Sequence, residues 1–263
     1  MLHGGLNIAV AAARRAGRLI LRQLPKRDSI PVTEKANMDF ATEVDRSVEL
    51  EIRKDLRRAF PDHAFLGEET GASGSARFQW VVDPLDGTSN FIHGIGHFAV
   101  SIALLDRDEP ITGVIFDPLR NELYVAEKGR GALLNDRRLR VSGRRGLAGA
   151  MLATGFAPRT RSQLASQLAI TGALLAEAED IRRSGSAALD LAYVACARYD
   201  AYYEAGVKPW DIAAGLLLVR EAGGQVGDFG NGEACFEKGE VVAGNLHLVK
   251  AMRKAMAPHL GTL

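Results

Sequence analysis

The sequence predicts an α+β fold in which helices and antiparallel strands are mixed. Long segments with apolar residues at helical spacing open and close the chain. Between them, short apolar runs are separated by only a few polar residues, which is typical of antiparallel strands. Both kinds of segment occur in both halves of the chain, so we do not expect a strict alternation of strand and helix.

Two amphipathic helices are expected near the start of the chain, over residues 6–24 and 42–60. Each carries one apolar stripe, and each stops at a proline, Pro25 or Pro61, that cannot continue it. The segment 30–41 between them has no clear period. It predicts an extended arm or a hairpin that crosses toward the polar stretch described below.

Strands dominate the middle of the chain. Each expected run is short, apolar and bounded by turn-forming residues, and the short connections favour an antiparallel meander. The small polar residues 71–76 predict a surface loop. The expected strands are residues 64–66, 80–82, 99–105, 111–116, 122–126 and 131–135.

Strands and helices alternate less regularly in the second half. We expect strands over residues 151–154, 201–204, 225–227 and 241–243, and helices over residues 162–177, 186–197, 209–223 and 247–260. No repeat or low-complexity linker divides the chain, so residues 1–263 are expected to form a single domain. A soft boundary at residues 142–146 would separate halves 1–145 and 146–263, although that run is equally typical of a surface loop.

The composition is that of an ordinary globular protein, with 263 residues, 47% hydrophobic and 25% charged. Its 33 basic and 32 acidic residues nearly cancel, so charge alone favours neither nucleic acid nor an anionic membrane as a partner. Cys196 and Cys235 form no disulfide framework or zinc motif. With neither a signal-peptide pattern nor an apolar run long enough for a membrane span, we expect a cytoplasmic protein.

One apolar run ends abruptly in polar residues, in the stretch 80–91 with the sequence WVVDPLDGTSNF. Pro84 lacks the N–H donor that a central strand requires, and Gly87 permits a turn that other residues resist. The strand is therefore expected to stop here and the chain to bend.

The bend would bring Asp83 and Asp86 to the same side, while the amides of Gly87, Thr88 and Ser89 open a helix. Carboxylates require cations and free amides require an anion. The simplest ligand that satisfies both is a divalent metal ion carrying a phosphate.

Each acidic position also has a plain structural explanation. The Asp-Pro-Leu-Asp-Gly run is, by itself, as typical of a simple turn as of a site. Glu68 and Glu69 could be solvent-facing charges at a strand end, and Asp211 could simply cap a helix. Thr42 and Asp45 fit a capping box, worth about 1 kcal/mol to the helix. These explanations do not account for several separate elements that all end in acids.

Other uses of the acidic stretch fit less well. In an EF-hand that began at Asp83, Thr88 would stand where glycine is required and Gly94 where glutamate is required. Nothing indicates that either aspartate is held as a nucleophile for a covalent phosphoenzyme. Of the uses considered for the acidic stretch, metal-assisted hydrolysis is the one that remains.

Three motifs in register resemble the inositol monophosphatase family of magnesium-dependent, lithium-sensitive phosphatases: GEE at residues 67–69, DPLDGTSNF at 83–91 and WDIAAG at 210–215. Residues 121–125, 182–193 and 219–224 are most similar to its bacterial inositol-1-monophosphatases. The resemblance covers almost the whole chain. It implies a layered α-β-α-β-α sandwich of the inositol monophosphatase and fructose-1,6-bisphosphatase type.

The resemblance also implies roles for individual residues. Two or three Mg²⁺ ions would be held by carboxylates and one backbone carbonyl, with Li⁺ as an inhibitor. The ligands would be Glu68, Asp83, the Leu85 carbonyl oxygen, Asp86 and Asp211. Thr88 and Asp45 would orient the attacking water and take up its proton, and Gly87, Thr88 and Ser89 would bind the phosphate oxygens. Ser89 stands where the family more often has threonine, which conserves the hydroxyl.

The alcohol side of the substrate is expected to contact the second half of the chain. The implied residues are Arg182, Gly185, Ser186, Ala187, Glu204 and Asp211. Arg182 and Arg183 could equally be solvated or lie at a subunit contact. Lys35 and Asp39 match a family motif on the arm, as outer groups or as contacts of a third metal ion.

The function implied is hydrolysis of inositol-1-phosphate and related polyol or nucleoside monophosphates by a metal-activated water, without a phosphoenzyme. The alternative within the superfamily is an enzyme acting on fructose-1,6-bisphosphate or 3′-phosphoadenosine-5′-phosphate, which would need a second basic pocket. An alternative of another class is a binding role in bacterial ribosomal RNA transcription complexes. The resemblance also suggests a homodimer.

Overall fold

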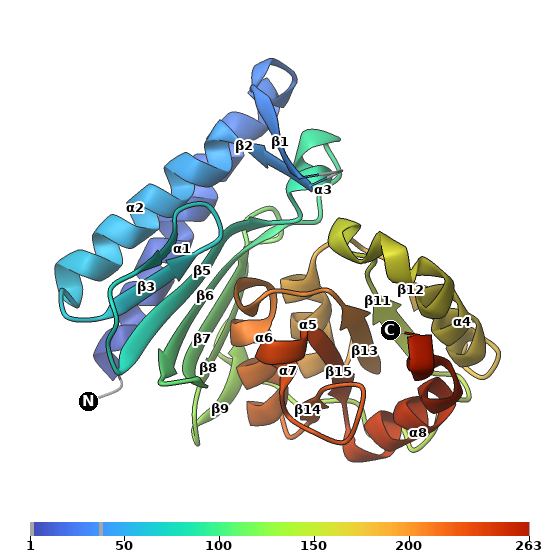
Figure 1. Ribbon diagram of the computed structural model, residues 1–263. Helices are drawn as coiled ribbons and strands as arrows, with labels where there is room; N and C mark the ends of the chain where they lie inside the picture. The colour runs from blue at the N-terminus through green and yellow to red at the C-terminus, as the bar shows by residue number, and fades with distance from the viewer. Residues whose placement is uncertain (1–2, 37–38, 263) are drawn as a thin grey trace.

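The chain forms a layered sandwich in the computed structural model, which describes residues 3–36 and 39–262. Within these residues the strands make an eight-stranded sheet, a five-stranded sheet and a two-stranded ribbon. Figure 1 shows one helix pair on the outer face of the larger sheet, a second pair between the sheets and a third beyond the smaller sheet. The pairs are α1 (His3–Gln23) with α2 (Glu43–Ala59), α5 (Ala187–Ala195) with α6 (Pro209–Glu221), and α4 (Leu164–Leu175) with α8 (Leu246–Met256). The predicted α-β-α-β-α arrangement is confirmed.

The larger sheet has the strand order β10-β9-β8-β7-β6-β5-β3-β4. Its neighbours pair antiparallel except β3 and β5, which are parallel, so the meander predicted for residues 99–135 is confirmed. The strands are β3 (Ala64–Gly67), β4 (Gly71–Ser73), β5 (Phe78–Asp86), β6 (Ala99–Asp106), β7 (Glu109–Asp117), β8 (Glu122–Glu127), β9 (Gly131–Leu134) and β10 (Arg137–Arg138).

The smaller sheet has the order β12-β11-β13-β15-β14 and uses strands of the second half alone. In its centre, β11 and β13 pair in parallel, whereas β13 and β15 pair antiparallel. The strands are β11 (Met151–Thr154), β12 (Asp180–Arg182), β13 (Ala201–Ala205), β14 (Gln225–Gly227) and β15 (Glu240–Gly244). Separately, β1 (Val32–Ala36) and β2 (Asp39–Thr42) form the hairpin that was one of the two expectations for the arm.

Alternate residues of the larger sheet face different layers, because successive side chains on a strand point to opposite faces. Trp80 packs with the cluster under α1 and α2, whereas Val81 packs with the cluster around α5 and α6. The same alternation separates Val114 from Ile115. Apolar residues on both faces explain why these strands show near-continuous apolar runs.

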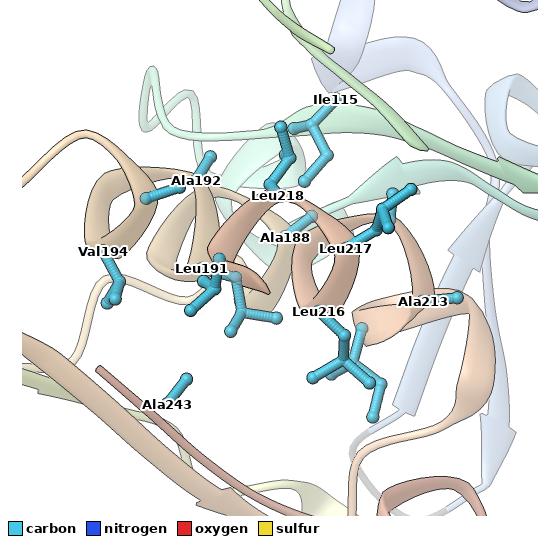
Figure 2. Packing of buried hydrophobic residues seen from close by; sticks show 14 of the residues in the cluster. Ile115, Ala188, Leu191, Ala192, Val194, Ala213, Leu216, Leu217, Leu218 and Ala243 are labelled. Atoms are coloured by element: carbon cyan, nitrogen blue, oxygen red, sulfur yellow. The ribbon is translucent and has the colours of Figure 1, made fainter. Parts of the chain in front are cut away.

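Helix α6 is buried over most of its surface because it lies between the two sheets. Residues 212–219 are all buried, and Figure 2 shows Leu216, Leu217 and Leu218 among side chains from α5 and the larger sheet. A helix that is apolar all round is expected only where it is covered on every side. This central helix begins with the WDIAAG motif, which places Asp211 at its first turn.

Several short elements were not predicted. Residues 71–73 form β4 against β3, where a surface loop was expected. Strands β10 and β12, the short helix α7 (Cys235–Lys238) and the 3-10 turns at Leu24–Ser29, Pro158–Gln163 and Ala257–Thr262 were not predicted either. The helix expected to open at residues 87–89 is present as the short α3 (Thr88–Ile92). Strands β4 and β12 have only three residues each, which is too few to show a period.

The prediction that the strand stops at Pro84 is wrong. Strand β5 continues to Asp86, but its pairing with β6 shifts there: Asp83 faces Ser101 and Asp86 faces Ala99. One extra residue on β5 therefore forms a bulge, where a proline does not remove a required ladder bond. The bend that the sequence predicted is present as this bulge.

The strands of the larger sheet come from residues 64–138 and those of the smaller sheet from 151–244. The subdivision of the domain near residues 142–146 stays a prediction. In the part of the chain that the structure covers, no helix is long and apolar enough to cross a membrane.

Candidate active site

The parallel pairing of β3 with β5 places two acids side by side. Gly67 pairs with Val82, so Glu68 and Asp83 are the next residues along the two neighbouring chains. The Glu68 N–H also donates to the Val82 carbonyl at 3.2 Å. A hydrogen bond joins the two acidic side chains, and Asp83 is only 2% exposed.

The bulge of β5 turns Asp86 toward the second half of the chain. Its Oδ2 accepts hydrogen bonds from the Ser186 hydroxyl at 2.6 Å and the Ala188 N–H at 2.7 Å. Ser186 is the N-cap of α5, and its Oγ accepts from the Leu189 N–H at 3.3 Å. Asp86 thus connects the larger sheet to the start of a helix 100 residues away in sequence.

Gly87 makes the turn from β5 into α3. Its φ is 96°, and a Cβ there would lie 2.9 Å from the His97 carbonyl oxygen, so no other residue fits without strain. The first backbone bond of the helix runs from the Phe91 N–H to the Gly87 carbonyl, at 3.0 Å. The N–H groups of Thr88 and Ser89 precede that bond, as donors at a helix start do.

Asp45 connects the start of α2 to the same turn. Its Oδ2 accepts from the Thr42 N–H at 2.7 Å and the Thr42 hydroxyl at 2.5 Å, and its Oδ1 accepts from the Thr88 hydroxyl at 2.8 Å. The capping box is therefore present, and Asp45 also contacts the candidate site. Burial raises the pKa of the Asp45 carboxyl, and the hydrogen bonds from Thr42 and Thr88 oppose that rise.

The second half contributes two further acids. The Tyr202 hydroxyl donates to Glu204 Oε2 at 2.6 Å, which fixes the Glu204 carboxylate on β13. Asp211 caps α6 by accepting the Lys208 N–H at 2.7 Å. As with Asp45, a capping role and a position in the candidate site occur together.

These groups converge on a cavity of about 540 Å³. Of the predicted catalytic, metal, phosphate and substrate residues whose side chains are described, all except Asp45 and Arg182 line it, and Asp45 lies behind Thr88. The predicted residues that line it are Glu68, Asp83, Leu85, Asp86, Gly87, Thr88, Ser89, Gly185, Ser186, Ala187, Glu204 and Asp211.

Arg182 is placed differently from the prediction. It pairs with Asp180 on β12, and both side chains are about half exposed, whereas Arg183 lines the cavity. Residues two apart on a strand share a face, which explains why Arg182 follows Asp180 and the next residue turns the other way. The structure therefore favours Arg183 as the arginine of the site.

The buried acids raise one another's pKa values. Burial raises the pKa of Asp83 well above its usual range, and the charges of Glu68, Asp86 and Asp211 add to the rise. Burial raises the pKa of Asp86 to about 7, opposed by hydrogen bonds from Ser186 and Ala188. A bound cation would relieve this repulsion.

The oxygen-only donor set suits Mg²⁺ better than a softer metal ion. Among residues 3–36 and 39–262, no three His, Cys, Asp or Glu side chains already stand at metal-binding spacing. The carboxylates would therefore have to move toward a cation as it binds. The chemistry of these acids therefore suits a metal ion, but binding requires this rearrangement of the carboxylates.

Sequence reasoning missed several lining residues. Asn90 donates to the His97 carbonyl at 2.7 Å and to the Ser184 carbonyl at 2.9 Å, so it ties α3 to the segment before Gly185. Its place inside the stretch 80–91 was a signal that could have been used. The Ser184 hydroxyl donates a hydrogen bond to Asp190 Oδ1. The other unpredicted lining residues are His93, Gly155, Phe156, Ala157 and Arg161. The side chains of Lys35 and Asp39 lie outside the described part of the structure.

Comparison with known proteins identifies the fold and the motifs. A sequence profile of the inositol monophosphatase family matches residues 1–261. The chain belongs to the inositol monophosphatase family. The resemblance carried by the three motifs is thereby confirmed, and with it membership of a family of metal-dependent phosphatases that act on small phosphate esters.

Relatives cover nearly the full length of the chain. A Nus factor SuhB of Xylella fastidiosa is 54% identical over 257 residues, covering 95% of this chain and 94% of that protein. The crystal structure of the extragenic suppressor protein suhB of Bartonella henselae has a TM-score of 0.92 at 42% identity, covering 95% of this chain and 97% of that one. An inositol monophosphatase of Anabaena has a TM-score of 0.89 at 36% identity, covering 98% and 96%. The name Nus factor, borne by this Xylella relative, indicates a role in transcription complexes within the family.

Proposed function

We propose that this protein is a Mg²⁺-dependent phosphomonoesterase that hydrolyses inositol-1-phosphate and related polyol or nucleoside monophosphates. One observation carries the proposal: the acids Glu68, Asp83, Asp86 and Asp211 line one cavity together with the turn into α3. Two of these acids have pKa values raised by burial and by their neighbours. Such a concentration of negative charge beside backbone donors suits a cation that carries a phosphate.

The residues proposed to hold two or three Mg²⁺ ions are Glu68, Asp83, the Leu85 carbonyl oxygen, Asp86 and Asp211. Bound Mg²⁺ would lower the pKa of an attacking water and neutralise charge on the phosphate and on the leaving oxygen. Asp83 lies between the other acids, because Glu68 follows the neighbouring strand β3 on one side and Asp86 lies across the bulge on the other.

Thr88 and Asp45 are proposed to handle the proton of the attacking water. The Thr88 hydroxyl donates to Asp45 Oδ1 and can therefore accept a hydrogen bond from a water in the cavity. As that water attacks phosphorus and the ester bond breaks, its proton passes through Thr88 to Asp45. Burial of Asp45 raises its pKa, which favours uptake of the proton.

The remaining residues are proposed to bind the two ends of the substrate. Gly87, Thr88 and Ser89 line the cavity, and their backbone N–H groups would donate hydrogen bonds to the phosphate oxygens. The alcohol would contact Glu204 and Asp211, the segment of Gly185, Ser186 and Ala187, and Arg183 in place of Arg182. Because the Anabaena relative is named an inositol monophosphatase, inositol-1-phosphate is the first substrate to test.

A panel of phosphate esters tests the substrate. Phosphate release should be faster from inositol-1-phosphate than from fructose-1,6-bisphosphate or 3′-phosphoadenosine-5′-phosphate, and Li⁺ should inhibit it. The bisphosphates are included as alternative substrates because Arg161 and Arg183 both line the cavity and could bind a second phosphate. Faster turnover of either bisphosphate would reject the monophosphate proposal.

A second candidate function is a binding role in transcription complexes, favoured by the name Nus factor for a relative that matches almost end to end. It can be separated from catalysis with Asp83→Asn and Asp86→Asn, which should remove turnover. Growth complementation by variants without turnover would support the binding role. Loss of complementation together with turnover, in variants that stay folded, would support catalysis as the required activity.

We also propose, from the family resemblance, that the protein is a cytoplasmic homodimer. Light scattering at several protein concentrations would measure the mass of the assembly. A mass that matched the 28.3 kDa chain at every concentration would contradict the homodimer.

A further inference from the structure

A buried glutamate on α2 contacts the turn that carries Glu68. Glu49 is 0% exposed and lies one helical turn after Asp45. Its Oε2 accepts the Glu69 N–H at 2.8 Å, and its Oε1 accepts the Thr70 N–H at 2.8 Å. Both oxygens of this carboxylate therefore bind backbone donors of the two residues that follow Glu68.

Gly67 makes room for this contact. A Cβ at residue 67 would lie 2.4 Å from the carboxyl carbon of Glu49, which is far inside the van der Waals distance. The carboxylate thus occupies the space that any other residue at this position would fill. The glycine before Glu68 and the glutamate on α2 form one packing unit.

Three successive backbone N–H groups around Glu68 are consequently held. That of Glu68 donates to Val82 on β5, and those of Glu69 and Thr70 donate to Glu49. Arg53, a further turn along α2, also donates to the Thr70 hydroxyl at 3.4 Å. The backbone that carries Glu68 is therefore fixed between β5 and α2.

We propose that Glu49 is a positioning residue that holds Glu68 in place for Mg²⁺. The inference rests on the proposed function, in which Glu68 is a metal ligand. Residues four apart lie on the same face of a helix, so Asp45 and Glu49 project from α2 side by side. One face of this helix then fixes two separate parts of the site: Asp45 holds Thr88, and Glu49 holds the turn of Glu68.

The conservative change Glu49→Gln tests this role. Glutamine keeps the shape of the side chain but places an N–H₂ group against one of the two backbone N–H donors, where no hydrogen bond can form. Loss of a partner that orients a metal ligand typically weakens metal binding by about 10–100-fold. We expect a loss of that size in a calorimetric titration of Mg²⁺ into the full chain.

Activity should show a matching pattern. In Glu49→Gln the Mg²⁺ concentration for half-maximal phosphate release should rise by about the same 10–100-fold, while kcat at saturating Mg²⁺ stays near that of the wild type. The matched control is Glu51→Gln on the same helix, because Glu51 only pairs with Lys54 in an exposed contact at 3.5 Å. This control should bind Mg²⁺ like the wild type.

Gly67→Ala tests the same contact from the other side. It leaves Glu49 intact but displaces its carboxylate, so Mg²⁺ binding should weaken here too, and circular dichroism should confirm that each variant is folded. Wild-type Mg²⁺ affinity in both folded variants would overturn the role of Glu49 and leave the proposed function standing. A wild-type protein that bound no Mg²⁺ would overturn both.

Discussion

Individual acids of the cavity occupy positions that are costly without a counter-ion. Asp83 is 2% exposed and has three acidic neighbours, and Asp86 has a pKa of about 7. A folded-state pKa above the ordinary value means that the protonated form is favoured by folding. The stability contributed by Asp86 is therefore present below its unfolded pKa and is lost as the pH rises through about 7.

This linkage predicts a pH-dependent effect of Mg²⁺ on stability. At pH 6 a proton competes for Asp86, and at pH 8 the carboxylate is ionised and available to a cation. The Mg²⁺-induced rise in melting temperature should therefore be larger at pH 8 than at pH 6. Thermal unfolding in chelator and in Mg²⁺ at both pH values measures it, and Asp86→Asn should remove most of the difference. An equal rise at both pH values would contradict the prediction.

Thr88 offers a test of the proton path. Thr88→Ala removes the hydroxyl that contacts Asp45, so kcat for phosphate release should fall by about 10²–10⁴-fold, the usual worth of positioned acid–base groups. Thr88→Ser keeps the hydroxyl and should retain most of the activity. If Thr88→Ala turned over like the wild type, the proposed proton path would be wrong.

Residue types and motif order predicted most of the site, but single-residue orientation was harder to predict. The acids that the sequence singled out could be recognised because each stands next to a strand or helix end, and the structure brings Glu68, Asp83, Asp86 and Asp211 to one cavity. It did not distinguish Arg183 from Arg182, because that choice depends on the face of β12, a strand too short to show a period. Asp190 was missed because an aspartate in the first turn of a helix already has a plain structural explanation there.

At the scale of elements, the bulge in β5 and the turn into α3 determine where the acids and the phosphate donors lie. The bulge lies between Asp83 and Asp86, and the turn follows directly at Gly87. The sequence predicted a bend here but placed the end of the strand too early. Proline excludes a regular ladder, whereas a bulge has an unpaired position that accepts it.

Gly87→Ala should destabilise this turn. A left-handed backbone costs about 1–2 kcal/mol for a residue with a Cβ, and the contact with the His97 carbonyl adds to that cost. Urea unfolding should show a lower midpoint and an unchanged slope. Gly143→Ala is the control, because a Cβ there meets nothing within 4 Å. Equal midpoints for the two variants would contradict the structure of the turn.

At the scale of the whole molecule, α5 and α6 join the two sheets and so bring together acids from both halves. Asp211 starts α6, and Asp86 of the larger sheet binds the start of α5. The sequence predicted the order of the main helices and of most strands, since long periodic segments are recognisable locally. The pairing order of the strands depends on contacts between distant segments, which periodicity does not reveal.

The central layer should therefore be sensitive to truncation. Leu218 on α6 is 0% exposed and packs between the sheets, so Leu218→Ala should lower the free energy of unfolding by about 2–5 kcal/mol. Leu50→Ala is the matched control, because Leu50 on α2 is 49% exposed. Its change should stay within about 0.5 kcal/mol. A small loss for Leu218→Ala would indicate that α6 is not the centre of the core.

The most direct test of the account is the metal requirement of phosphate release from inositol-1-phosphate. The purified protein is assayed in chelator, then again after Mg²⁺ is restored in excess, beside Asp83→Asn under the same conditions. Release should stop in chelator, return with Mg²⁺ and stay absent in the variant. Release that continued in chelator would contradict the claim that the converging acids serve by binding a cation.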